Sequence, residues 1–336
     1  MNLALDASYS LGSELSGVGI YSRELLHALA ISHPEQRFAW KYRPHRFRRA
    51  LKEPEPANVT RKILWDTLGL RSGLFHGLNQ RLPQRRYPKQ IATFHDLFVL
   101  TADYSTPEFR ARFAAQARHA ANQADLIIAV SHFTAGQVHA LLGVERSRIR
   151  VVHHGVMPRR LPPLQREKIV LSVGAVQTRK NTGRLMEAFR AMPPDWRLIL
   201  VGSSGYGASS LVSNYQDNRI SFTGYIDDRE LAKLYATASI FAFPSLDEGF
   251  GMPVLEAMAA GIPVITSNRS AMPEIAGDAA ILIDPEDASQ LAEALNNLAA
   301  NTKFCSELAA RGQIRAHQFT WERAARETWA VYQELR

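Results

Sequence analysis

The chain has 336 residues, 46% hydrophobic and 21% charged, which is the composition of a folded protein and a length that suits two domains. Its single cysteine excludes an intrachain disulfide framework and a cysteine-based zinc site. The formal net charge of +8 favours anionic partners. No apolar run approaches the ~20 residues that span a bilayer, and the first residues lack signal-peptide features, so we expect a cytoplasmic protein.

The first half of the chain alternates strand-like apolar runs with helical periodicity, which predicts a parallel sheet with crossover helices. The strands are expected at residues 3–5, 91–94, 126–130 and 151–152, and the helices at 21–30 and 107–123. Gly17 and Gly19 lie in a turn before the first helix, where a ligand could approach the backbone closely. His95 ends the 91–94 strand, where it would either contact a substrate hydroxyl or be a satisfied core histidine.

Arginines and lysines crowd the segment 41–89, which holds only three acidic residues and several interleaved aromatic ones. Such a segment fits an anionic membrane surface, which attracts about 1 kcal/mol per well-placed cation. It also fits a nucleic acid backbone, or a solvated basic face without a partner. Because no nucleic-acid motif accompanies the charge, we expect no nucleic acid partner.

The second half restarts the alternation after the segment 157–168, whose three prolines and flanking charges predict a linker. The strands are expected at residues 169–173, 197–201, 219–222, 240–243, 263–266 and 280–283. The sequence therefore predicts two α/β domains. Ligands of such sheets bind at the carboxyl ends of the strands, which here means the cleft between the domains.

Arg179 and Lys180 follow the 169–173 strand and precede a predicted helix through Leu185 and Met192, capped by Asn181 or Thr182. Adjacent cations at a helix N-terminus suit a diphosphate, because arginine binds it bidentately and lysine adds a point charge. The alternative is that both are ordinary surface cations.

Two carboxylates, Glu248 and Glu256, flank a Gly-Phe-Gly turn that opens a short helix. Pro253 suits its first turn and Gly261 the position after its end. Helix N-terminal N–H groups suit a phosphate and carboxylates suit sugar hydroxyls, so the pair predicts a nucleotide-sugar site. The alternative is that the acidic residues are caps beside a connecting turn.

Other signals are weaker. The glycines at 202–207 lack the G-x-G-x-x-G order of a dinucleotide site and indicate a flexible loop. No Asp-x-Asp motif occurs, the His153–His154 pair has no carboxylates at ligand spacing, and Asp228 is expected to cap a helix. We therefore expect no metal site.

Together these segments resemble the retaining glycosyltransferases of family 4, over nearly the whole chain. The similar segments lie, in family order, at 16–25, 95–97, 130–134, 154–156, 179–181, 243–251, 273–280 and 319–322. The Glu-x7-Glu segment with Arg-Lys upstream is the most specific part. Gln177-Thr178 departs from the Glu-Pro that often precedes Arg-Lys-Asn, which bears on loop shape and sugar preference.

The resemblance implies an α/β protein of GT-B architecture, with two Rossmann-like domains that face each other across a cleft. The implied parts are an N-terminal acceptor-side domain at 1–160, a C-terminal nucleotide-sugar-binding domain at 161–316, and a helix at 317–336 that crosses back to the first domain.

The resemblance also implies roles for single residues. Arg179 and Lys180 would neutralise the leaving diphosphate, Glu248 would lie by the transferred sugar, and His95 would contact the donor sugar. Six further positions would bind other parts of the donor: Glu256 the ribose, Gly249, Phe250 and Gly251 the surroundings of the sugar, and Tyr225 and Ile226 the base. Gly17 and Gly19 would lie near a phosphate of the donor or near the acceptor.

The implied reaction moves a hexose, mannose or a related sugar, from a nucleoside-diphosphate sugar to a glycan or lipid-linked acceptor in cell-surface polysaccharide biosynthesis. Configuration would be retained, no metal would be needed because the cations stabilise the leaving group, and a GDP-sugar is slightly favoured over a UDP-sugar. We also expect peripheral contact with the inner membrane face through 41–89. The alternatives are a sugar-nucleotide epimerase or hydrolase on the same fold, and a non-catalytic scaffold or nucleic-acid-binding protein.

Overall fold

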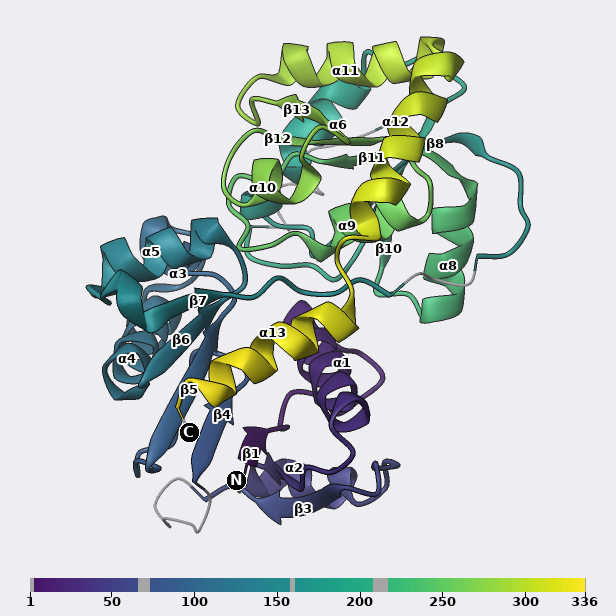
Figure 1. The fold of residues 1–336 in the computed structure, drawn as a ribbon. Helices are drawn as coiled ribbons and strands as arrows, with labels where there is room; N and C mark the ends of the chain where they lie inside the picture. The colour runs from purple at the N-terminus through teal and green to yellow at the C-terminus, as the bar shows by residue number, and fades with distance from the viewer. Residues whose placement is uncertain (1–2, 66–72, 158–160, 208–216, 336) are drawn as a thin grey trace. The chain divides into compact units, whose positions relative to one another are not determined.

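The chain folds into two compact units (Figure 1). Unit 1 comprises Met1–Gly155 and Phe319–Arg336, and unit 2 comprises Val156–Gln318. The computed structural model describes residues 3–65, 73–157, 161–207 and 217–335.

Unit 1 is built on a seven-stranded parallel sheet of order β3-β2-β1-β4-β5-β6-β7. Its strands are β1 (Leu3–Asp6), β2 (Phe38–Tyr42), β3 (Val59–Ile63), β4 (Leu74–Gly77), β5 (Lys89–Phe94), β6 (Leu126–Ala129) and β7 (Ile149–Val151). Its helices are α1 (Gly17–Ser32), α2 (Pro44–Ala50), α3 (Phe98–Thr101), α4 (Pro107–Gln123), α5 (His132–Leu142), the 3-10 turn η1 (Arg146–Arg148) and α13 (Trp321–Gln333).

Two apolar clusters sandwich this sheet, as expected when helices cover both faces. One cluster contains Leu25 of α1 and Val331 of α13, and these two helices lie side by side (Figure 1). The other contains Phe113 of α4 and Val138 of α5. The last helix of the chain therefore belongs to the core of unit 1.

Unit 2 is built on a six-stranded parallel sheet of order β10-β9-β8-β11-β12-β13. Its strands are β8 (Glu167–Val173), β9 (Arg197–Val201), β10 (Ile220–Gly224), β11 (Ala238–Phe243), β12 (Val264–Ser267) and β13 (Ile281–Ile283). Its helices are the 3-10 turn η2 (Thr178–Lys180), α6 (Thr182–Phe189), α8 (Asp228–Thr237), α9 (Met252–Ala259), α10 (Met272–Ala276), α11 (Ala288–Ala300) and α12 (Thr302–Ala316). Within the sheet the chain order reads 3-2-1-4-5-6, the order of Rossmann folds.

The structure confirms the α/β class and the predicted strands to within a few residues, and it corrects several details. Strands β2, β3 and β4 were not predicted, and the linker ends early because β8 begins at Glu167. The first helix begins at Gly17, because Ser16 caps it by accepting a hydrogen bond from the Gly19 amide. Asp227 caps α8 in the same way, so the expectation that Asp228 does so was wrong. Residues 158–160 of the linker lie outside the described residues.

The basic segment 41–89 is not one continuous basic surface. Lys41 lies in β2 and is buried, and its ammonium donates a 2.9 Å hydrogen bond to the Tyr87 hydroxyl. Burial, together with the nearby Lys62, lowers the pKa of Lys41 to about 8. Lys41 is thus excluded from any surface contact, and Arg71 lies outside the described residues. None of the described helices is long and apolar enough to cross a membrane.

Candidate active site

A polar site in unit 2 lies where the strand order reverses, between β8 and β11. The loop after β8 carries Arg179 and Lys180 in η2, and the loop after β11 carries the residues 244–251. Because β8 and β11 are parallel neighbours, their carboxyl ends bring the two loops together. Ligands of open α/β sheets bind at such a switch point.

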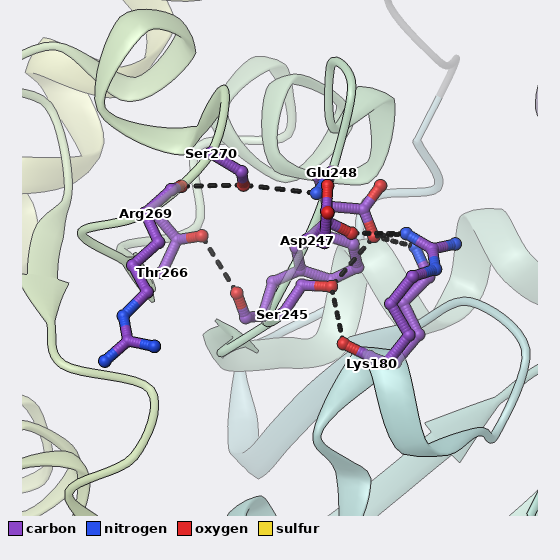
Figure 2. A network of polar contacts seen from close by, with 9 residues as sticks. Lys180, Ser245, Asp247, Glu248, Thr266, Arg269 and Ser270 are labelled. Carbon is purple, nitrogen blue, oxygen red and sulfur yellow. Dashed lines mark hydrogen bonds and ion pairs between the residues drawn. The ribbon is translucent and has the colours of Figure 1, made fainter. Parts of the chain in front are cut away.

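Glu248 is the centre of this site (Figure 2). Its Oε1 atom accepts 2.8 Å hydrogen bonds from Arg179 Nη1 and from Ser245 Oγ, and it also pairs with the Lys180 ammonium. The side chains of Arg179, Lys180 and Glu248 are only 9%, 15% and 10% exposed. The structure therefore brings three of the four predicted catalytic residues into one nearly buried ion cluster.

Backbone contacts fix the two loops against each other. Leu246 N donates to the Arg179 carbonyl at 2.9 Å, and Lys180 Nζ lies 4.6 Å from the centre of the Phe243 ring. Glu248 N donates to Ser270 Oγ at 3.1 Å, and Ser270 has a φ of +55°, which is uncommon for a residue with a side chain. Backbone strain of this kind is held in place only by the surrounding contacts, and it gathers at functional sites.

The charge state of the cluster follows from its contacts. Burial alone would raise the pKa of Glu248, but Arg179, Lys180 and the hydrogen bonds from Lys180 and Ser245 outweigh it, so the pKa is lowered overall. The carboxylate is therefore ionised at neutral pH. The three paired side chains carry two cations against one anion, and the buried carboxylate of the neighbouring Asp247 adds a second acidic group to the site.

Helix α9 begins directly after this cluster. Gly251 is its N-cap with a φ of +91°, and a Cβ built there would lie 2.3 Å from Met272 Cε, so the position favours glycine. Pro253 lies in the first turn and Gly261 follows the end with a φ of +67°, which confirms both predictions. The Glu256 carboxylate lies in the second turn and accepts a 2.9 Å hydrogen bond from the Tyr235 hydroxyl of α8.

The other predicted donor-binding residues of unit 2 lie in two loops. Gly249 and Phe250 are buried between Glu248 and the start of α9. Tyr225, which is 52% exposed, and Ile226 lie in the loop between β10 and α8. Their positions are now known, and their roles stay predictions.

Unit 1 holds the remaining predicted residues. His95 follows β5, is buried, and bonds through Nε2 to the Leu78 carbonyl at 2.9 Å, while the edge of its ring contacts Tyr21 at 4.6 Å between ring centres. Burial lowers its pKa to about 4, so it is neutral near pH 7. We expected Gly17 and Gly19 in a turn before the first helix, but both lie within the first turn of α1.

Three polar residues of the unit 2 site were not predicted individually. Ser245 and Asp247 lie in the loop that carries Glu248, and the Asp247 carbonyl accepts from Arg179. Ser270 comes from the loop after β12. The signal for Ser245 was its position three residues before Glu248, whereas nothing local marked Ser270.

No group of three or more histidine, cysteine, aspartate or glutamate side chains suited to a metal ion occurs within the described part of the chain.

Comparisons with known proteins decide the family. Residues 30–160 match the family model "Glycosyltransferase Family 4", and residues 157–315 match "Glycosyl transferases group 1". The chain is 31% identical over 297 residues to the O-antigen chain mannosyltransferase B of Escherichia coli, and this match covers 82% of this chain and 78% of that protein. This chain belongs to glycosyltransferase family 4.

Solved structures agree on the fold. Sucrose-phosphate synthase from Thermosynechococcus elongatus superposes with a TM-score of 0.78 at 23% identity, over 100% of this chain and 99% of that one. Anabaena HepE in complex with UDP-glucose gives 0.73 at 19% identity, over 98% and 99% of the two chains. The two parallel sheets of this glycosyltransferase are thus those of the predicted GT-B fold.

Proposed function

We propose that this glycosyltransferase moves a hexose, mannose or a closely related sugar, from a nucleoside-diphosphate sugar to a hydroxyl of a glycan or lipid-linked acceptor. The E. coli relative at 31% identity is named an O-antigen chain mannosyltransferase, which supports mannose and a place in cell-surface polysaccharide biosynthesis. The structure of HepE with UDP-glucose supports a nucleotide sugar as the donor class. A GDP-sugar is our first choice for this chain.

The observation that carries the proposal is the pair Arg179 and Lys180, held on Glu248 at the strand switch point. Breaking the anomeric C–O bond releases an anionic diphosphate and leaves positive charge on the sugar. Preorganised cations lower the energy of that charge separation, and the loss of one such donor costs on the order of 10²–10³ in rate. With this charge supplied by side chains, we propose that the reaction needs no metal.

The other residues would place the donor around this centre. Glu256 would accept hydrogen bonds from the ribose hydroxyls, and the Tyr235 hydroxyl would keep its carboxylate in position. Gly249, Phe250 and Gly251 would lie near the transferred sugar. Tyr225 and Ile226 would flank the base.

Three residues of unit 1 have proposed roles of their own. We propose that His95 contacts the donor sugar as a neutral hydrogen-bonding group, because its pKa lies well below 7. Because glycine has no side chain, Gly17 and Gly19 would let a phosphate or the acceptor approach the backbone of the first turn of α1.

Retention at the anomeric carbon completes the proposal, and it is supported by the family resemblance. NMR of the first-formed product distinguishes the anomers through the one-bond coupling between C1 and H1, which separates the α and β anomers of mannose as well as those of other hexoses. An initially inverted product would refute retention and leave the donor site untouched.

The direct test of the donor site is calorimetric titration with GDP, UDP and ADP in EDTA. We expect one nucleotide to bind, and we expect the Glu256→Ala variant to bind it about tenfold more weakly, while inorganic pyrophosphate, which lacks the ribose, binds both proteins alike. Glu293→Ala removes an exposed carboxylate of α11 and serves as the matched control. Binding of all three nucleotides only after a divalent metal is added would contradict metal independence, and no binding under either condition would contradict the donor site.

Two assays address the acceptor and the location. Consumption of donor without any acceptor would indicate a hydrolase or epimerase, whereas a transferase requires the acceptor. We propose peripheral membrane contact through the exposed cations of 41–89, and flotation with phosphatidylglycerol vesicles, compared with phosphatidylcholine vesicles, tests it.

A further inference from the structure

A polar cavity of about 440 Å³ lies in unit 1, and none of the predicted site residues lines it. It is lined by Tyr9, the residues 11–16 of the β1–α1 loop, and Arg46 and Arg49 of α2. This loop follows β1 and α2 follows β2, so the cavity lies at the carboxyl end of two adjacent strands. That edge is where sheets of this topology bind ligands.

Arg49 is seated on the loop in a defined way. A Cβ built on Gly12 would lie 3.3 Å from Nη2, 3.4 Å from Cζ and 3.5 Å from Nη1 of Arg49, so the guanidinium lies flat against the glycine backbone. Gly12 has a φ of +126°, a conformation that side chains rarely adopt. The absence of a side chain at Gly12 thus leaves room for the guanidinium beside the cavity.

Arg46 and Arg49 are three residues apart on one helix and therefore neighbours on its surface, where two like charges repel. Within the described residues neither side chain has a hydrogen bond or an ion pair. By contrast, Arg61 and Arg86 pair with Glu55 and Asp125.

Glu14 is the single acidic residue in the lining, so the lining carries two cations against one anion. The neighbouring loop adds further positive charge, because Arg81 donates to the Tyr9 hydroxyl at 3.1 Å. Two adjacent arginines in a cavity, without a partner among the residues that the structure describes, suit an anionic ligand.

We propose that this cavity binds a phosphate or diphosphate group of the acceptor substrate. Arginine forks bind phosphate oxygens bidentately, and the two arginines reach the cavity from one face of the same helix. The cavity is larger than a phosphate group, which leaves room for the glycan or lipid attached to it. That the phosphate belongs to the acceptor rests on the proposed function, whereas the phosphate site itself rests on the cavity alone.

The first experiment is residue-resolved protection. Phenylglyoxal modifies exposed arginines, and peptide mass spectrometry reports the rate at each one. We expect inorganic pyrophosphate to slow the modification of Arg46 and Arg49 by about tenfold, and to leave Arg48, an exposed arginine of the same helix outside the lining, unchanged. Equal protection of all three, or of none, would overturn the site.

The second experiment separates a lipid-linked phosphate from a soluble one. The Arg46→Ala/Arg49→Ala protein is compared with Arg112→Ala/Arg118→Ala, which loses the same charge at exposed positions of α4, outside both the cavity and the segment 41–89. On phosphatidylcholine vesicles that carry a polyprenyl diphosphate, we expect the first variant alone to lose flotation. Equal loss by both variants would mean diffuse charge and would overturn the site, whereas protection without any flotation would support the site and indicate a soluble phosphorylated acceptor.

Neither experiment uses turnover or a nucleotide. Protection of Arg46 and Arg49 in a protein that fails to bind any nucleoside diphosphate would refute the proposed function and keep the phosphate site. Nucleotide binding by a protein in which pyrophosphate protects neither Arg46 nor Arg49 would support the proposed function and refute the phosphate site.

Discussion

Replacing Glu248 by alanine tests whether the cation cluster is held by that carboxylate. The change leaves Arg179 and Lys180, which are 9% and 15% exposed, without their shared partner. Removing one member of a buried ion pair typically costs about 3–5 kcal/mol, because the remaining charge stays desolvated. For a unit of this size about 1 kcal/mol shifts the unfolding temperature by roughly 2–4 °C, so we expect unit 2 to unfold roughly 6–20 °C lower.

Glu286→Ala is the matched control, because Glu286 pairs with Arg269 in the same unit but is 63% exposed. Exposed pairs contribute about 0–1 kcal/mol. Two units need not unfold together, so the assay is hydrogen exchange resolved to peptides, which reports β8 and β11 separately from unit 1. An E248A protein whose unit 2 peptides exchange like those of E286A would refute the reasoning.

The same variant has a second, opposite effect on ligand binding. Glu248 neutralises one of the two cations and also repels an incoming anion. We therefore expect a nucleoside diphosphate to raise the unfolding temperature of E248A by more degrees than it raises that of the wild type. Equal stabilisation of both proteins would mean that the diphosphate does not meet these cations.

Three further predictions follow from single contacts. Lys180→Met keeps the packing of the side chain on Phe243 but removes its charge. We therefore expect calorimetry to show about tenfold weaker binding of a nucleoside diphosphate, and unchanged affinity would mean that Lys180 is not part of the site. Burial lowers the pKa of His76 to about 3, so the neutral imidazole contributes its full stability above pH 6.5 and this contribution is lost as the pH falls toward 3. In urea titrations, the free energy of unfolding of His76→Asn should therefore fall less steeply between pH 6.5 and 4 than that of the wild type. The same dependence on pH in both proteins would contradict this. Gly251→Ala should destabilise unit 2 by about 1–3 kcal/mol because of its φ of +91° and the contact with Met272, whereas hydrogen exchange equal to the wild type would show that the start of α9 can adjust.

Much of the fold could be predicted from the sequence because buried parallel strands appear as short apolar runs between helical segments. Strand β2 was missed although Phe38, Trp40 and Tyr42 are buried in it, because the charges around it suggested a surface segment. A lysine on a central strand is rarely buried, and Lys41 is tolerated because the Tyr87 hydroxyl accepts its hydrogen bond. The order of the strands was beyond reach of local patterns, since it depends on which strands pair.

The site was predicted in pieces and not as a cluster. Arg179, Lys180 and Glu248 were each chosen for their chemistry, but 69 residues separate Arg179 from Glu248, and only the pairing of β8 with β11 brings them together. The sequence suggested that Glu248 faces sugar hydroxyls, whereas the structure pairs it with the two cations. Ser270 could not be predicted, because its role depends on a backbone conformation that its residue type does not favour.

The pairing of Glu248 reconciles these two views of its role. Without a diphosphate, two nearly buried cations need a counter-charge, and the carboxylate supplies it through the single atom Oε1. A bound diphosphate would bring its own negative charge to the same cations, and the carboxylate would then be less tightly held and able to accept a hydrogen bond from a sugar hydroxyl. One residue would in this way keep the empty site stable and contact the sugar once the donor is bound. An anion beside a diphosphate is unfavourable, and the site tolerates this carboxylate because it stabilises the cluster when the ligand is absent.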